Sequence, residues 1–240
     1  QAGAFFHGYY GDHCFLPLYV FCGEQLLVAY LRPGNSDAAR HAWAVLKLLV
    51  ARLRQAWPQV KLTFRGDSGF CRWRLLRWCE DHDVKYIVGL AKNARLLARA
   101  EALVTQAQQA FAERKEKQRL FGEVRYAAET WDRARRVLVK AEHTDKGSNP
   151  RFVVTNLAGD AQKLYDEGYC ARGEMENRIK EQQLGLFADR TSGHGWWANQ
   201  FRLLLSGCAY GLVERLRALA LAGTELARAQ ASTIRLKLLK

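Results

Sequence analysis

Asp67 is the first candidate for a catalytic or ligand-binding residue, because of its type and its position. It follows a short apolar run at residues 60–64 that predicts a strand, and Gly66 and Gly69 stand on either side of it. A carboxylate at the end of a strand in an open α/β sheet lies where such sheets bind ligands. Asp67 could therefore act in a ligand or metal site, or it could cap the helical turn that follows.

A second candidate is a charged stripe in the segment 169–180. Arg172, Glu176 and Lys180 are spaced by four residues, and Tyr169 lies three before Arg172, so that all four project from one face of a helix. Such a stripe is commonly a solvated surface in which each ion pair contributes about 0.3–0.5 kcal/mol. It also suits a carboxylate that holds a metal ion between two cations that bind phosphates. The residues alone leave both interpretations open.

Other catalytic chemistries lack their motifs. The six histidines show no H-x-x-x-H pairing and the six cysteines form no C-x-x-C pair, so a zinc site is not expected. There is no P-loop, no G-x-G-x-x-G and no G-x-S-x-G elbow. Cysteines without metal or disulfide spacing, together with the lack of signal-peptide anatomy, indicate a reducing cytoplasm.

The elements that would position these residues form an α/β pattern. The hydrophobic periodicity predicts, in chain order, strands at residues 15–22 and 25–32, a helix at 39–57, a strand at 60–64, a helix containing Leu75, Leu76 and Trp78, and a strand at 86–90. This order indicates a mixed sheet covered by helices.

Beyond residue 92 the pattern predicts an insertion and a helical C-terminal part. Expected there are a helix at 93–120, strands at 123–128, 136–141 and 152–155, and helices at 160–186 and 198–221. We divide the chain into a first core part (1–92), a helical and β-rich insertion (93–157), a second core part with the Glu176 helix (158–222) and a basic C-terminal tail (223–240).

The charge of the chain points to a polyanionic partner. Lys and Arg outnumber Asp and Glu by 37 to 24, which gives a formal net charge of +13. An excess of this size raises affinity for nucleic acid first, and for an anionic membrane or an acidic protein second. No polybasic amphipathic anchor is present, and the longest nearly apolar run, 203–213, is about half of a membrane span. These features favour nucleic acid and no membrane partner.

Several longer segments have the residue order of one known family. The spacing Tyr169-x2-Arg172-x3-Glu176, downstream of a strand that ends in Asp67, resembles the signature of bacterial insertion-sequence DDE transposases. Closer similarity is to the insertion-sequence group thirteen-eighty, in the segments His7-Gly-Tyr-Tyr10, Leu16-Pro-Leu-Tyr19, Arg65-Gly-Asp-Ser-Gly-Phe70, the run 169–183, Phe187-Ala-Asp-Arg-Thr-Ser192 and the tail 233–240. The run 169–183 is the most specific of these.

The resemblance implies a ribonuclease-H-like fold, with a mixed sheet flanked by helices. In such enzymes three carboxylates hold two divalent metal ions, normally Mg²⁺ with Mn²⁺ as a substitute, for in-line substitution at a phosphodiester. By position, Asp67 corresponds to the second carboxylate and Glu176 to the third. Arg172 and Lys180 would contact phosphates of double-stranded DNA, at transposon ends and target, and Tyr169 would position the strand. The resemblance leaves open whether the active form is a homodimer.

Two departures limit what the resemblance implies. The signature often has a lysine seven residues after the glutamate, where this sequence has Gln183. The family's first aspartate precedes the His7 segment, before the point where this sequence begins, and Asp12 is not taken as its replacement. We therefore expect an N-terminally incomplete chain that lacks the first strand and does not transpose DNA alone. Two alternatives stay open: a non-catalytic DNA-binding remnant, and a nuclease on the same fold that cleaves without specific end sequences.

Overall fold

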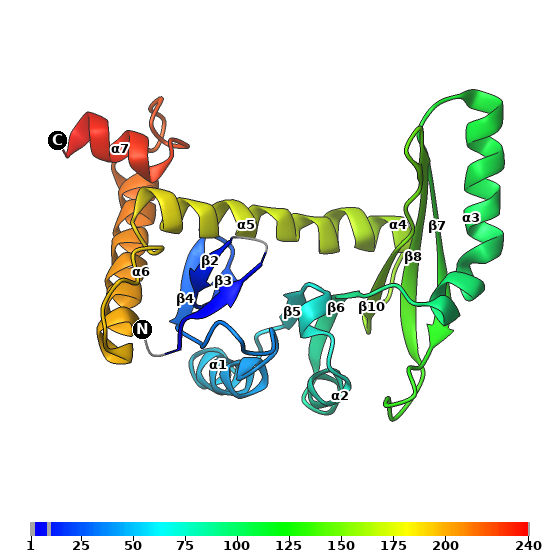
Figure 1. Ribbon diagram of the computed structural model, residues 1–240, viewed down its shortest axis with the longest axis horizontal. Coiled ribbons are helices and arrows are strands. Elements are labelled where there is room, and N and C mark those ends of the chain that lie inside the picture. The colour runs from blue at the N-terminus through cyan, green and yellow to red at the C-terminus, as the bar shows by residue number, and fades with distance from the viewer. Residues whose placement is uncertain (1–2, 9–10, 240) are drawn as a thin grey trace. The chain divides into compact units, whose positions relative to one another are not determined.

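The computed structural model describes residues 3–8 and 11–239. Tyr9 and Tyr10 of the His7-Gly-Tyr-Tyr10 segment and Lys240 of the tail lie outside the described residues. The chain forms two compact units, whose elements are labelled in Figure 1. Unit 1 comprises Gln1–Asp37 with Gly173–Lys240, and unit 2 comprises Ala38–Arg172. The four-part division at residues 92, 157 and 222 stays a prediction beside these units.

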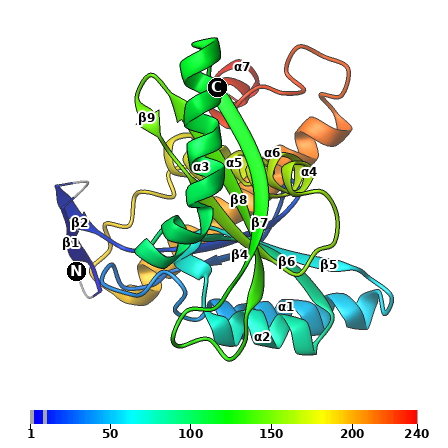
Figure 2. The same cartoon turned by 90° about the vertical axis from the view of Figure 1, so that its right-hand side faces the viewer.

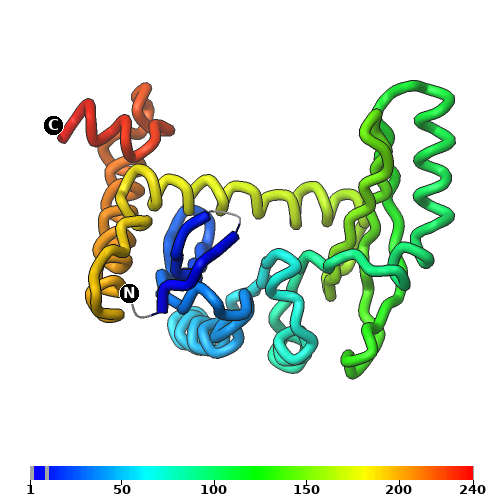
Figure 3. Tube along the Cα trace, viewed as in Figure 1, coloured from blue at the N-terminus to red at the C-terminus, as the bar shows by residue number. Residues whose placement is uncertain are grey.

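Unit 2 is built on a mixed sheet of six strands in the order β5-β6-β10-β8-β7, with β9 paired to β8. The strands are β5 (Leu62–Gly66), β6 (Val84–Leu90), β7 (Gln118–Tyr126), β8 (Arg135–Thr144), β9 (Gly147–Ser148) and β10 (Arg151–Thr155). In this sheet β5 and β6 pair in parallel, and the other described pairs are antiparallel. The expected mixed sheet is therefore confirmed. Figure 3 follows the chain trace through the structure.

Helices cover both faces of this sheet. On one face α1 (Ala42–Ala56), α2 (Trp73–Asp81) and α3 (Ala94–Arg114) share a core with Tyr86, Val88 and Val137, and Figure 2 shows α3 beside β7 and β8. On the other face α4 (Ala161–Lys163) and the π-helical segment η2 (Leu164–Tyr169) pack on Ile87 and Leu138. Successive strand residues point to opposite faces, which is why Ile87 and Val88 enter different cores.

Unit 1 combines two hairpins with helices. Its elements are β1 (Phe5–His7) paired with β2 (Asp12–Cys14), β3 (Leu18–Cys22) paired with β4 (Gln25–Tyr30), α5 (Gly173–Lys180), the π-helical η4 (Glu181–Gly185), α6 (Trp196–Leu219) and α7 (Ala231–Leu238). The buried Gln200 of α6 donates to the Ala29 carbonyl at 3.1 Å and accepts from the Leu31 N–H at 2.7 Å. These bonds fasten α6 to the second hairpin.

The structure differs from the sequence expectations at several places. Within the described residues β3 and β4 pair only with each other, so the hairpin forms a sheet of its own. The helix expected over 93–120 ends at Arg114, because Lys115 adopts a left-handed conformation with φ of 57°, and residues 118–122 belong to β7 instead. The β1–β2 hairpin was not expected. The helical character of 160–186 is confirmed, but its helix type changes along the run.

Candidate functional site

Asp67 stands where the parallel strand β5 ends. It has an extended backbone, with φ of −80° and ψ of −175°, and it precedes the one-turn 3₁₀ helix η1 (Ser68–Phe70). Its Oδ1 accepts the Gly69 N–H at 2.8 Å, so Asp67 does cap this turn. Gly66 before it is buried, and a β-carbon there would lie 3.1 Å from the Phe70 Cβ. The cap fixes one carboxylate oxygen and leaves the other to face the neighbouring helical segment.

Arg172 and Tyr169 come to Asp67 from that segment. Arg172 belongs to the short 3₁₀ helix η3 (Cys170–Arg172), and its Nη1 lies 3.7 Å from the Asp67 Oδ2. The Arg172 side chain is 22% exposed and that of Asp67 is 44% exposed. Tyr169 ends η2, and its ring lies 5.6 Å from that of Tyr165, centroid to centroid. The structure thus brings together three of the five residues that the sequence nominated.

The pKa of Tyr169 is shifted by its neighbours in this cluster. Burial raises the pKa of Tyr169, and the negative charge of Asp67 raises it as well. The Arg172 charge and a side-chain hydrogen bond from Arg172 act in the opposite direction. The phenol is therefore protonated at neutral pH and can serve as a hydrogen-bonding group, but not as a base.

Glu176 and Lys180 lie on α5, which belongs to unit 1. Both side chains are exposed, and they are separated by one helical turn. Glu174 on the same helix pairs with Arg178 at 3.3 Å. Two of the predicted site residues are therefore described in unit 1 and three in unit 2.

The ligand chemistry at Asp67 suits a hard divalent cation, because Mg²⁺ prefers carboxylate oxygens. The Asp67 side chain is partly exposed, and its Oδ2 faces the Arg172 guanidinium. One carboxylate is not a complete site, however. Among the described residues no three His, Cys, Asp or Glu side chains are grouped to hold a metal ion.

An ion network in unit 2 was not anticipated from the sequence. The Arg135 side chain is only 2% exposed and bonds Glu80 through Nε at 2.7 Å and Nη2 at 3.1 Å. Its Nη1 pairs with Asp132 at 2.9 Å, and the Tyr86 hydroxyl donates to Glu80 at 2.7 Å. These contacts join α2, β6 and β8. No spacing in the sequence signals the Arg135–Glu80 pair, because its partners are 55 residues apart and meet only through the packing of α2 on the sheet.

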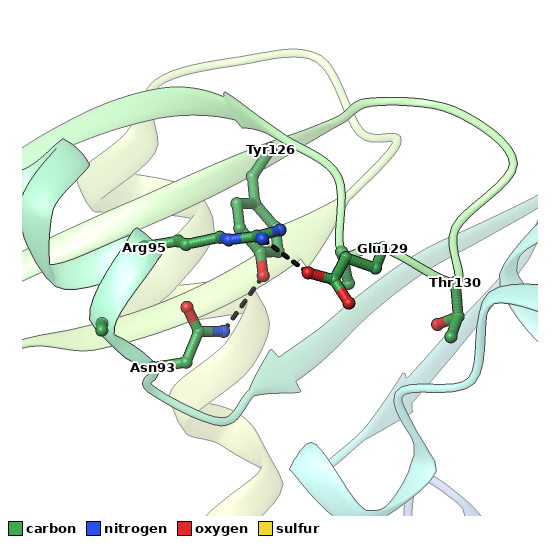
Figure 4. Close-up of a pocket in the computed structure, with 7 residues that line it drawn as sticks. Asn93, Arg95, Tyr126, Glu129 and Thr130 are labelled. Carbon is green, nitrogen blue, oxygen red and sulfur yellow. Dashed lines mark hydrogen bonds and ion pairs between the residues drawn. The ribbon is translucent and has the colours of Figure 1, made fainter.

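Two surface pockets lie elsewhere. Figure 4 shows one of about 420 Å³ in unit 2, where Arg95 pairs with Glu129 at 2.5 Å and Asn93 donates to the Tyr126 hydroxyl at 3.0 Å. The other, of about 480 Å³ in unit 1, is lined by residues that include Asp12 and residues 189–192. Neither pocket is lined by any of the five predicted site residues.

The chain matches a known protein family. A family model described as transposase DDE domain group 1 matches residues 1–240. None of the curated proteins matches the chain. Of the helices in the described part of the chain, not one has the length and apolar character needed to span a membrane. All six cysteines are free thiols.

Proposed function

The chain belongs to the transposase DDE domain group 1 family, and on that premise we propose that it is the catalytic domain of an insertion-sequence DNA transposase. Membership of the family implies a transposase function, action on DNA and a nuclease-type reaction. The proposal adds the particular insertion-sequence group thirteen-eighty, the ribonuclease-H-like form of the fold, and the assignment of individual residues. Each of these additions has its own support in the residues of the two units.

The observation that carries the proposal is the meeting of Asp67 with Arg172 and Tyr169. The sequence nominated Asp67 from its place after a strand, and the other two from the spacing of a distant helical segment. In unit 2 the Arg172 Nη1 lies 3.7 Å from the Asp67 Oδ2. A carboxylate at the end of a parallel strand, in a mixed sheet with helices on both faces, is also what the ribonuclease-H-like interpretation expects.

Each nominated residue has a role that follows from its chemistry. Asp67 and Glu176 are the carboxylates that would hold divalent cations, Mg²⁺ or Mn²⁺. When bound, such ions supply an activated water and charge stabilisation for phosphodiester substitution. Arg172 offers a planar guanidinium for a phosphate of the DNA backbone, and Lys180 offers a point charge. The protonated Tyr169 hydroxyl is suited to donate a hydrogen bond to the same strand.

The test uses the full-length protein and a labelled DNA that carries the ends of the insertion sequence. We expect Asp67→Asn and Glu176→Gln each to reduce the cleavage rate by about a hundredfold or more while DNA affinity is retained. The matched controls are Asp145→Asn, in the exposed turn after β8, and Glu174→Gln, on the same helix as Glu176. Both controls should cleave at nearly the wild-type rate.

Chelation with EDTA should abolish cleavage, and added Mg²⁺ or Mn²⁺ should restore it. Full activity of Asp67→Asn and Glu176→Gln would refute the site assignment. A wild-type protein that binds end DNA but never cleaves it would favour the non-catalytic DNA-binding alternative. Cleavage that unrelated competitor DNA suppresses as well as end DNA does would favour a nuclease without end specificity.

A further inference from the structure

Gly89 packs against the cluster that Asp67 and Tyr169 form. It is buried in β6, where it pairs with Val153 of β10, and the neighbouring Val88 pairs with Gly66 at the end of β5. A β-carbon built on Gly89 would lie 2.6 Å from the Tyr169 hydroxyl oxygen. It would also lie 2.9 Å from the Ser68 backbone nitrogen and 3.2 Å from the Asp67 carbonyl carbon. The Tyr169 hydroxyl and the Asp67–Ser68 peptide can therefore approach β6 this closely only because residue 89 has no side chain.

Backbone conformation does not account for this glycine. Gly89 is not one of the glycines with positive φ, so its dihedral angles do not require a residue without a β-carbon. Glycine inside a strand costs about 0.5–1 kcal/mol relative to alanine, and it commonly marks a close approach of another backbone. Here the approaching groups are the Tyr169 hydroxyl and the Asp67–Ser68 peptide.

The close approach concerns backbone as well as a side chain. Ser68 is the first residue of η1, and the turn that it opens is the one that Asp67 caps through Gly69. A methyl group on residue 89 would have to displace this peptide, because a backbone nitrogen cannot rotate away as the end of a side chain can. The displacement would move the Asp67 carboxylate relative to Arg172 and would push the Tyr169 hydroxyl from its place.

We propose that Gly89 is a positioning residue of the transposase reaction. Because it has no side chain, it determines how closely the Asp67 carboxylate and the Tyr169 hydroxyl lie to strand β6. The inference rests on the proposed function. Gly89 touches neither substrate nor metal in this role. It allows Asp67 and Tyr169 to pack close to β6, and in that position both groups lie next to Arg172.

The sheet offers a matched control glycine. Gly122 lies in β7, and a β-carbon there would lie 3.1 Å from the Leu103 Cδ2, which is the end of a flexible side chain. Gly122→Ala thus introduces the same methyl group into the same sheet, against α3 instead of the Asp67 cluster. It measures the general effect of an added methyl group on the fold.

The experiment compares wild type, Gly89→Ala, Gly122→Ala, Tyr169→Phe and the double variant Gly89→Ala/Tyr169→Phe in the full-length protein. Single-turnover cleavage at saturating end DNA gives the rate, a binding titration gives the affinity, and thermal unfolding gives the folded fraction. We expect Gly89→Ala to reduce the saturated rate by about tenfold to a hundredfold, because a displacement near 1 Å can cost that much. The DNA affinity should change by less than about threefold, since the displaced carboxylate acts in the chemical step.

The double variant tests the contact with the hydroxyl. Tyr169→Phe removes the atom nearest to the added methyl group, so Gly89→Ala should cost several-fold less in the Tyr169→Phe protein than in wild type. An equal cost in both would overturn the part of the inference that concerns Tyr169. A wild-type rate in folded Gly89→Ala, or a rate loss that only follows the unfolded fraction, would overturn the inference as a whole. If Asp67→Asn stays active or wild type does not cleave, the proposed function fails, and the inference fails with it. An active wild type with an inactive Asp67→Asn and a fully active Gly89→Ala removes the inference alone.

Discussion

The guanidinium of Arg172 lies beside the carboxylate of Asp67, with 3.7 Å between Nη1 and Oδ2. This separation is at the long end of an ion pair, and neither side chain is fully buried. Such a pair contributes at most about 1 kcal/mol to folding, because water screens it and the side chains lose rotamer freedom. This pair by itself therefore contributes little to folding, and the partly exposed guanidinium of Arg172 can also bind an anion.

We predict that Arg172→Ala weakens DNA binding with a modest effect on stability. If Arg172 contacts one phosphate, the slope of log affinity against log salt concentration should become smaller by about one. The free energy of unfolding should fall by about 1–2 kcal/mol, because both the Asp67 pair and the hydrogen bond to Tyr169 are lost. Binding titrations over a series of salt concentrations, with urea unfolding of the same samples, measure both quantities.

Lys146→Ala is the control for this prediction, because Lys146 is an exposed cation in the turn after β8. Its salt slope should stay closer to that of wild type. A salt slope unchanged by Arg172→Ala, or one that Lys146→Ala lowers as much, would count against a specific phosphate contact. A binding constant that does not vary with salt in wild type would count against the nucleic-acid interpretation as a whole.

Local patterns of the sequence predicted the elements of the fold well. Two runs of apolar, aromatic and β-branched residues, at 15–22 and 25–32, predicted the two strands of the β3–β4 hairpin, and Gly23 between them has φ of 57° in the structure. The four-residue spacing of the Tyr169–Lys180 segment predicted a helix, and the segment is helical. In each case neighbours along the chain decide the conformation, so the information lies in a short window of sequence.

Strand order and long-range ion pairs could not be predicted in this way. The pairing of β10 between β6 and β8 depends on contacts between distant segments, and each strand has the same apolar pattern whichever neighbour it takes. The bonds between Arg135 and Glu80 have the same origin. In the candidate site, Asp67 was predicted from its place after a strand. The contribution of Gly89 was not, because a glycine in a strand does not reveal what packs against it.

Glu80 should be a strong determinant of the stability of unit 2. The Arg135 guanidinium that it binds is 2% exposed, so the loss of the partner charge leaves a buried cation partly uncompensated. We predict that Glu80→Gln lowers the free energy of unfolding by about 3 kcal/mol, since removal of one partner of a buried pair typically costs about 3–5 kcal/mol and Asp132 compensates in part. Urea unfolding monitored by tryptophan fluorescence measures the change.

Glu129→Gln provides the comparison for Glu80→Gln, because it is the same substitution in an exposed pair. Glu129 binds Arg95, and the two side chains are 74% and 62% exposed. Its effect should stay within about 0.5 kcal/mol. Equal effects of the two substitutions would mean that the Glu80–Arg135 pair does not stabilise the sheet as its burial indicates.

The ionisation of Asp132 should contribute to the pH dependence of the free energy of unfolding. Burial raises the pKa of this carboxyl. Hydrogen bonds from Arg135, Arg133 and Arg77 lower the pKa by a larger amount, so it lies well below its usual range. A carboxylate whose pKa is depressed by folding stabilises the folded state above its unfolded pKa, near 3.9, and loses that contribution as the pH falls through the folded pKa. Wild type should therefore exceed Asp132→Asn in unfolding free energy at neutral pH, and the difference should shrink below about pH 4.

Asp83→Asn, which removes the exposed partner of Lys85, should give a much smaller difference at every pH. Parallel curves for wild type and Asp132→Asn from pH 7 to 3 in urea unfolding would show that the three arginines do not hold the Asp132 charge.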